Sequence, residues 1–112
     1  MMNAYSDYYI NEAQDWLGEY FETSVRVLNV ELKEAWRSFV MSHYSLSFAS
    51  GDPFTIDGKS GTEVVFELFN KRVKKLPFLY DRTPEYWLGW SLAYYQWERN
   101  IPFIFIYHQV DI

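Results

Sequence analysis

The sequence predicts a mainly α, single compact helical domain over residues 1–112. We expect about four helices around a central C-terminal helix, followed by a short extended C-terminal arm. Apolar residues recur at three- and four-residue steps through most of the chain, which is the spacing of amphipathic helices. Helix-capping signals stand at the ends of several of these stretches. A chain of 112 residues fits one domain, and such a domain buries roughly two thirds of its unfolded surface.

The clearest helix is predicted over residues 83–100. Thr83 can cap its first N–H groups, and Pro84 fits the first helical position, where a missing donor costs nothing. Asn100 can take the left-handed conformation that closes a helix, and Pro102 prevents the helix from resuming. The sequence therefore marks both ends of this helix.

The same helix carries apolar side chains in most directions, and a helix of this kind is usually buried within its domain. Gly89, Ser91 and Ala93 are small, so a neighbouring helix can approach closely at these positions. We therefore expect this helix to be the central one.

Two helices are expected earlier in the chain, over residues 5–30 and 31–50. Each has an apolar stripe at helical spacing. Asn29 marks the break between them, and the glycine–proline combination at Gly51 and Pro53 ends the second.

A third helix is expected over residues 60–75, after a turn at Asp57 and Gly58. Ser60 and Glu63 match a capping box at its start. Four basic residues near its end suit the negative pole of the helix dipole: Lys71, Arg72, Lys74 and Lys75.

The tail, residues 101–112, has a different composition. Residues 103–107 are β-branched or aromatic, which is typical of a strand, but no other segment reads as a partner strand. We expect an extended arm that either packs over the helices or pairs with its copy in a homodimer, because an exposed apolar edge invites such pairing.

Composition narrows the functional classes. Aromatic residues make up 21% of the chain, which predicts a core of large side chains and leaves open a surface binding patch. The absence of cysteine excludes disulfides, thiolate zinc sites and cysteine nucleophiles, and it fits a reducing compartment. No signal peptide or membrane-length apolar stretch is visible, so we expect a cytoplasmic protein with no membrane contact. The net charge of −5 argues against direct nucleic-acid binding.

The residue types of a catalytic or metal site do not assemble into a motif. His43 falls on the apolar stripe of its helix, where we expect a hydrogen-bonded core residue, and His108 lies in the tail. Residues 58–60 match the end of a phosphate-binding loop, but Pro53 stands where that motif needs its first glycine. We therefore expect no enzymatic activity, no cofactor and no metal.

Four carboxylates follow helical spacing along the first predicted helix: Glu12, Asp15, Glu19 and Glu22. A solvated face is the simple interpretation, and a docking surface for a basic protein is the sharper one. Residues 1–50 carry seven acidic and three basic groups, a net charge of −4, whereas residues 51–112 carry eight and seven, a net charge of −1. The negative charge is therefore concentrated in residues 1–50, which include these four carboxylates. We call the four the acidic stripe and take them as the predicted partner-binding site.

Three segments carry a resemblance: residues 8–13 (YYINEA), 58–63 (GKSGTE) and 84–97 (PEYWLGWSLAYYQW), with a further motif at 107–112 (YHQVDI). Their order and spacing resemble a family of small, mostly uncharacterised bacterial proteins. Between residues 97 and 107 the chain departs from that pattern, where family members have a longer helical segment.

Members of this family are often encoded beside ADP-ribosyltransferase-like proteins, an arrangement similar to a toxin–antitoxin pair. The resemblance thus implies a non-enzymatic, antitoxin-like protein that masks a neighbouring toxin-like partner. Three alternatives stay open: a phage-type acidic inhibitor of a nucleic-acid enzyme, in which the carboxylates stand in for phosphates; a small enzyme using His43 or His108; and a structural domain that dimerises through its tail.

Overall fold

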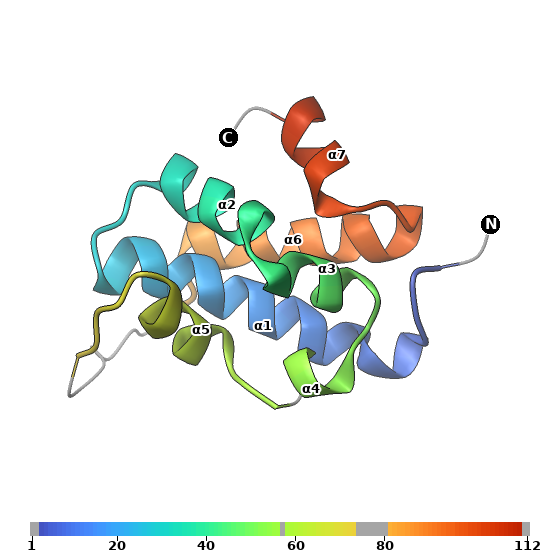
Figure 1. Cartoon of the computed structure of the whole chain (residues 1–112), viewed down its shortest axis with the longest axis horizontal. Coiled ribbons are helices and arrows are strands. Elements are labelled where there is room, and N and C mark those ends of the chain that lie inside the picture. The colour runs from blue at the N-terminus through green and yellow to red at the C-terminus, as the bar shows by residue number, and fades with distance from the viewer. Residues whose placement is uncertain (1–2, 57, 74–80, 111–112) are drawn as a thin grey trace.

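Helices form all the regular structure in the part of the chain that the computed structural model describes, residues 3–56, 58–73 and 81–110 (Figure 1). In chain order these are the 3-10 turn η1 (Asp7–Tyr9), α1 (Ile10–Glu22), the π-helical turn η2 (Thr23–Val27), α2 (Leu32–Met41), α3 (His43–Ala49), α4 (Pro53–Ile56), α5 (Gly61–Leu68), α6 (Pro84–Arg99) and α7 (Phe103–Gln109). The radius of gyration is 13.1 Å, and a compact domain of this length is expected to have one of about 13 Å. The mainly helical, compact prediction is confirmed, with more helical segments than the expected four.

The helix at the centre is α1, not α6. It contacts α2, α4, α5 and α6, and α6 runs antiparallel behind it in the view of Figure 1. α6 buries one side against α1 and leaves Trp87, Trp90 and Tyr94 between 38% and 50% exposed on the other. The prediction that the C-terminal helix is the central one is therefore wrong. The outer residues are mostly Trp and Tyr, whose rings tolerate partial exposure because each has a polar tip.

The contact between α1 and α6 is a contact between backbones. A Cβ atom on Gly89 would lie 2.3 Å from the carbonyl oxygen of Leu17, and one on Gly18 would lie 2.7 Å from the ring of Tyr86. Neither glycine can carry a side chain unless the helices move apart. The prediction that a neighbouring helix approaches closely at Gly89 is confirmed.

Capping at the helix ends agrees with the sequence-based expectations. The Thr83 hydroxyl accepts a hydrogen bond from the N–H of Tyr86, and Asn100 closes α6 with φ 52° and ψ 51°. The Ser60 hydroxyl accepts a hydrogen bond from the N–H of Glu63. Asn29 interrupts the helical structure before α2, with a φ of 58°. These signals are local in sequence, which is why they could be predicted.

The predicted helix over residues 31–50 is interrupted at Ser42, where the backbone is extended with ψ 159°. The Ser42 hydroxyl donates to the carbonyl of Phe39, and the Ser45 hydroxyl donates to the carbonyl of Val40. Serine side chains compete for backbone groups in this way, which offers the chain an alternative to a continuous helix. Two shorter helices, α2 and α3, result.

The predicted helix over residues 60–75 ends earlier, at Leu68. Asn70 follows in the left-handed conformation with a φ of 51°, and no residue after it continues the helix within the described segment. Lys71 and Arg72 therefore lie beyond the helix end, and Lys74 and Lys75 lie outside the described residues.

The tail forms the helix α7 rather than an extended arm. Phe103 and Ile106 are buried, and α7 packs against α2 and α3. The two buried residues are three positions apart, which is the spacing of one face of a helix. A short apolar run has no periodicity that separates helix from strand. A lone strand would leave its N–H and C=O groups unpaired, whereas a helix pairs them internally. The prediction of an extended arm is therefore wrong. The strand pairing between copies that this arm would have allowed has no basis in the structure of residues 103–109.

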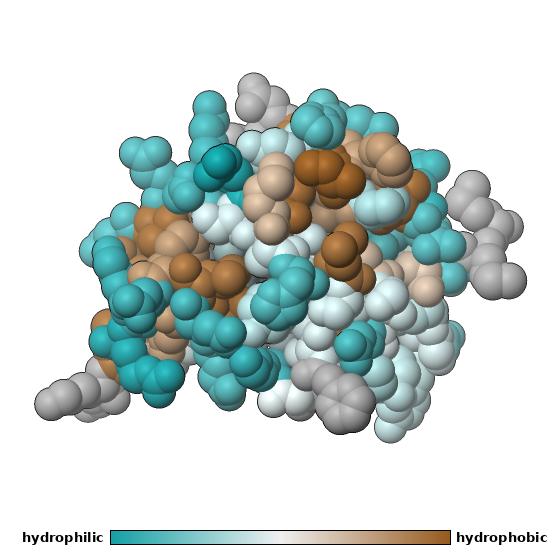
Figure 2. All heavy atoms as spheres, in the orientation of Figure 1, coloured by the Kyte–Doolittle hydropathy of each residue, from teal (hydrophilic) through white to brown (hydrophobic). Residues whose placement is uncertain are grey.

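Aromatic rings build the core between α1, α2, α3 and α7. Phe39 is central, with its ring centroid 5.3 Å from that of Tyr20, 6.0 Å from that of Phe48 and 5.0 Å from that of Phe103. Figure 2 shows further hydrophobic side chains gathered on the surface where α7 lies over this core. Within the described residues, no helix has both the length and the apolar character needed to cross a membrane.

We predict that Gly89→Ala destabilises the fold by about 1–3 kcal/mol, although alanine is the better helix former by about 1 kcal/mol. The added methyl group collides with the Leu17 carbonyl, which is backbone and cannot rotate away. Urea unfolding followed by circular dichroism measures the difference. Ser91→Ala, on the exposed side of the same helix, is the control and should change stability by less than about 0.5 kcal/mol. Equal stability of the two variants would contradict the close crossing.

The helical state of the tail makes a second prediction. Phe103→Ala and Ile106→Ala should each cost about 2–5 kcal/mol because both side chains are buried. Phe105→Ala should cost less than about 0.5 kcal/mol, because that ring is 55% exposed. An extended arm would instead place residues 103 and 105 on one side, so comparable losses at these two positions would argue against α7.

Candidate functional site

The four carboxylates of the predicted acidic stripe lie in different environments along α1. Glu12 and Asp15 are exposed, Glu19 is half-buried, and Glu22 is only 5% exposed. Three of the four carboxylates therefore lie at an accessible surface, and the fourth, Glu22, is buried.

Glu22 is occupied by the start of α6. Its carboxylate accepts hydrogen bonds from the backbone N–H and the hydroxyl of Thr83, both at 2.9 Å, and from the guanidinium of Arg82 at 3.2 Å. A carboxylate suits the positive end of a helix, and here it ties the end of α1 to the first turn of α6. Its partners lie 60 and 61 residues away in the sequence, so spacing alone could not reveal this role.

Asp15 is held in place by Tyr86 of α6. The Tyr86 hydroxyl donates to Asp15 Oδ1 at 2.5 Å. Burial, together with this bond to a carboxylate, raises the pKa of Tyr86 to about 12, so the phenol keeps its proton near neutral pH and remains a donor. The Tyr86 hydroxyl thereby fixes the orientation of the Asp15 carboxylate.

Glu19 is the half-buried carboxylate of the four. Burial raises the pKa of Glu19 above its ordinary value, and the negative charges of Asp15 and Glu22 act in the same direction, while Arg82 opposes them. A cation brought to this position would relieve the repulsion between neighbouring carboxylates.

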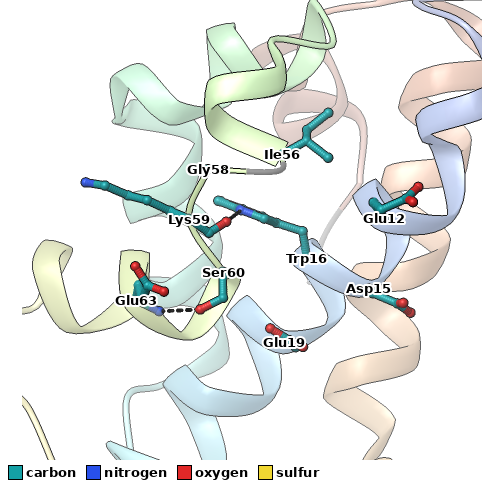
Figure 3. Close-up of a pocket in the computed structure, with 9 residues that line it drawn as sticks. All are labelled: Glu12, Asp15, Trp16, Glu19, Ile56, Gly58, Lys59, Ser60 and Glu63. Carbon is teal, nitrogen blue, oxygen red and sulfur yellow. Dashed lines mark hydrogen bonds between the residues drawn. The ribbon is translucent and has the colours of Figure 1, made fainter.

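A surface hollow of about 400 Å³ opens beside these residues, between α1 and the turn that leads into α5 (Figure 3). It is lined by Glu12, Asp15, Trp16, Glu19, Ile56, Gly58, Lys59, Ser60 and Glu63. Figure 3 shows Glu12 and Asp15 directed outward on the α1 side and Glu63 on the opposite side. The sequence identified Glu63 only as a capping residue. Its place on the hollow depends on the packing of α5 against α1, which no local pattern reveals.

Close packing of the turn against α1 fixes the hollow. The Trp16 indole N–H donates to the Lys59 carbonyl at 2.7 Å. A Cβ atom on Gly61 would lie 2.1 Å from the carbonyl oxygen of Trp16, so only glycine allows the first turn of α5 to lie this close. The loop backbone therefore has a defined position relative to the carboxylates.

The one lysine that lines the hollow is engaged elsewhere. The Lys59 side chain extends away from α1, and its ammonium donates to Glu67 at 2.7 Å and to the Tyr44 hydroxyl at 3.0 Å. Tyr44 donates to the same Glu67 carboxylate at 2.7 Å. These bonds raise the pKa of Lys59 and lower the pKa of Glu67, so both groups stay charged near neutral pH. The Lys59 ammonium therefore pairs with Glu67 and not with the carboxylates of α1.

The two histidines are both exposed. His43 begins α3, with its ring centroid 4.1 Å from that of Tyr44, and is not the core residue that the sequence predicted. The break at Ser42 shifts the helical phase, which turns residue 43 outward. His108 lies in the last turn of α7. Among residues 3–56, 58–73 and 81–110, no group of three or more His, Asp or Glu side chains is arranged to hold a metal ion.

Comparisons of the chain with protein-family models, with curated proteins and with solved structures gave no match. The interpretation of the hollow accordingly depends on its own geometry.

The different environments of Glu22 and Glu12 lead to a prediction. Glu22→Gln should destabilise the fold by roughly 1–3 kcal/mol, because an amide cannot accept both the Arg82 and Thr83 hydrogen bonds as a carboxylate does. Glu12→Gln, at an exposed position of the same helix, should change stability by less than about 0.5 kcal/mol. Thermal and urea unfolding of the two variants measure the difference. Equal effects would show that Glu22 behaves as an ordinary surface carboxylate.

Proposed function

We propose that this chain is a non-enzymatic, antitoxin-like protein of the cytoplasm that masks a basic surface of a partner protein. The observation that carries the proposal is the carboxylate rim of the hollow, formed by Glu12, Asp15 and Glu19 from α1 and by Glu63 from α5, while the neighbouring ammonium is paired with Glu67. These four carboxylates border one hollow on the surface.

The geometry favours binding over a merely solvated face. Asp15 is fixed by the Tyr86 hydroxyl, and the turn across the hollow is fixed by Trp16. Groups that are already in place lose little conformational entropy when a partner binds. Glu19 is partly desolvated, and a charge pair formed there is screened less by water than one on an open surface. Lysine or arginine side chains are the chemistry that such a rim recognises.

The identity of the partner is proposed from the sequence resemblance. The family that this chain resembles is often encoded beside ADP-ribosyltransferase-like proteins, so the proposed partner is such a neighbouring gene product. Masking a toxin requires a stable complex and no chemistry on the part of the antitoxin.

The test measures affinity for the purified neighbouring gene product by calorimetry. Neutralising the rim with Glu12→Gln, Asp15→Asn and Glu19→Gln in one variant should weaken binding roughly tenfold to a hundredfold, at about 0.5–0.9 kcal/mol for each charge pair lost. These residues are exposed or half-buried, and asparagine at position 15 still accepts from Tyr86, so the fold should persist.

The matched control is Glu31→Gln with Glu34→Gln, which removes exposed carboxylates at the start of α2. This control should bind like the unmodified chain. Unchanged affinity of the rim variant would exclude the hollow as the interface. Displacement of the partner by DNA would instead support the phosphate-mimic alternative.

A further inference from the structure

The side of the acidic stripe that faces α6 is occupied by groups of this chain. Asp15 accepts a hydrogen bond from the Tyr86 hydroxyl, and Glu22 forms an ion pair with Arg82 at 3.2 Å. Both partners come from α6 or from the residues directly before it. The two carboxylates on this side therefore already have counterparts within the fold.

The side of the stripe that faces α5 is open. A Cβ atom on Gly61 would lie 3.2 Å from the Cβ of Glu19, which places Glu19 against the first turn of α5. The hollow separates this side of α1 from Glu63 (Figure 3). In the part of the chain that the structure describes, Glu12, Glu19 and Glu63 form no ion pair. These three carboxylates are thus available to a cation from outside the chain.

Arg82 is held at the border between the two sides. Its guanidinium carbon lies 4.3 Å from the centroid of the Tyr86 ring, and its Nη1 atom lies 3.2 Å from Glu22 Oε1. Attraction to the ring face and a charge-assisted hydrogen bond both favour this position. The Arg82 side chain is nevertheless 49% exposed. Its positive charge is therefore felt at the surface as well as by Glu22.

The charge of Arg82 extends to the open side of the stripe. Burial raises the pKa of the Glu19 carboxyl, and the positive charge of Arg82 lowers it in part. A charge that stabilises the ionised form of Glu19 also repels a second cation that approaches the same carboxylate. Arg82 and a basic group of a partner therefore compete for the field of the stripe.

We propose that Arg82 is an internal counter-ion that sets the strength and the position of partner binding at the carboxylate rim. This inference rests on the proposed function. The guanidinium neutralises the α6 side of the stripe, so a basic partner is directed to the hollow on the α5 side. A protruding arginine or lysine that enters the hollow avoids Arg82, whereas a flat basic patch laid along the whole stripe meets it. Arg82 thus selects partners of the first kind.

The first test measures binding by calorimetry, with two probes: the neighbouring gene product and an oligoarginine peptide. Arg82→Gln should strengthen binding of both roughly threefold to tenfold at low ionic strength, and added salt should reduce this gain. Arg82→Met, which keeps an unbranched stem against the Tyr86 ring, should give the same result. Arg82→Lys keeps the charge and should bind like the unmodified chain.

The matched control is Arg99→Gln. Arg99 is also exposed and lies over a tyrosine ring, that of Tyr95, but at the other end of α6. Its removal changes the net charge of the chain equally, so it should alter binding by less than about twofold. Equal binding by Arg82→Gln and Arg99→Gln would overturn the proposal, because net charge alone would then explain the effect.

The second test needs no partner. In a carboxyl NMR titration of the free chain, Arg82→Gln should raise the pKa of Glu19 further, because the charge that lowers it is lost. Arg99→Gln should leave that pKa unchanged, and the same spectra show whether each variant is folded. An unchanged pKa of Glu19 in folded Arg82→Gln or Arg82→Met would overturn the proposal. Tighter oligoarginine binding without any binding of the neighbouring gene product would support the role of Arg82 and exclude the proposed partner.

Discussion

The close backbone contact between α1 and α6 is the constraint on which the rest of the structure depends. Gly18 and Gly89 remove the side chains that would otherwise separate the two helices. Close approach then lets the chain fasten the helices at intervals along their length. Glu22 binds the start of α6, and the Gln14 side-chain amide donates to the Trp90 carbonyl. The N–H of Ala4, which precedes η1, adds a bond from the N-terminal segment to the Trp97 carbonyl.

The same constraint determines which carboxylates form the carboxylate rim. Since α6 takes one side of α1, and α2 and α5 take others, the accessible part of α1 is narrow and carries Glu12, Asp15 and Glu19. A second glycine contact, at Gly61, brings α5 against the α1 backbone and adds Glu63 to the rim. Tyr86, a residue of the α6 interface, orients Asp15. The packing that builds the core thus also arranges the charged surface.

Local signals in the sequence predicted the ends of elements well, and long-range relations poorly. Thr83, Asn100, Ser60 and Asn29 act within a few residues of themselves, so their roles could be read directly. The tail was misjudged because a run of large apolar residues does not separate helix from strand, and the deciding contacts come from α2 and α3. Glu22 shared the spacing of its exposed neighbours, and its burial depends on Arg82 and Thr83. The centre of the fold was misplaced because hydrophobicity alone does not show which side of α6 is covered.

The abundance of aromatic residues has two separate physical consequences. Inside, rings such as Phe39 and Phe103 fill a small core with few side chains. Outside, the tryptophans and tyrosines of α6 give an apolar face to a chain of net charge −5. The two surfaces depend on different forces. Screening by salt weakens any attraction that the carboxylates of α1 exert on a cationic group. Burial of aromatic surface is not weakened by screening. The acidic and the aromatic surfaces of one chain should therefore respond differently to ionic strength, without any change in fold.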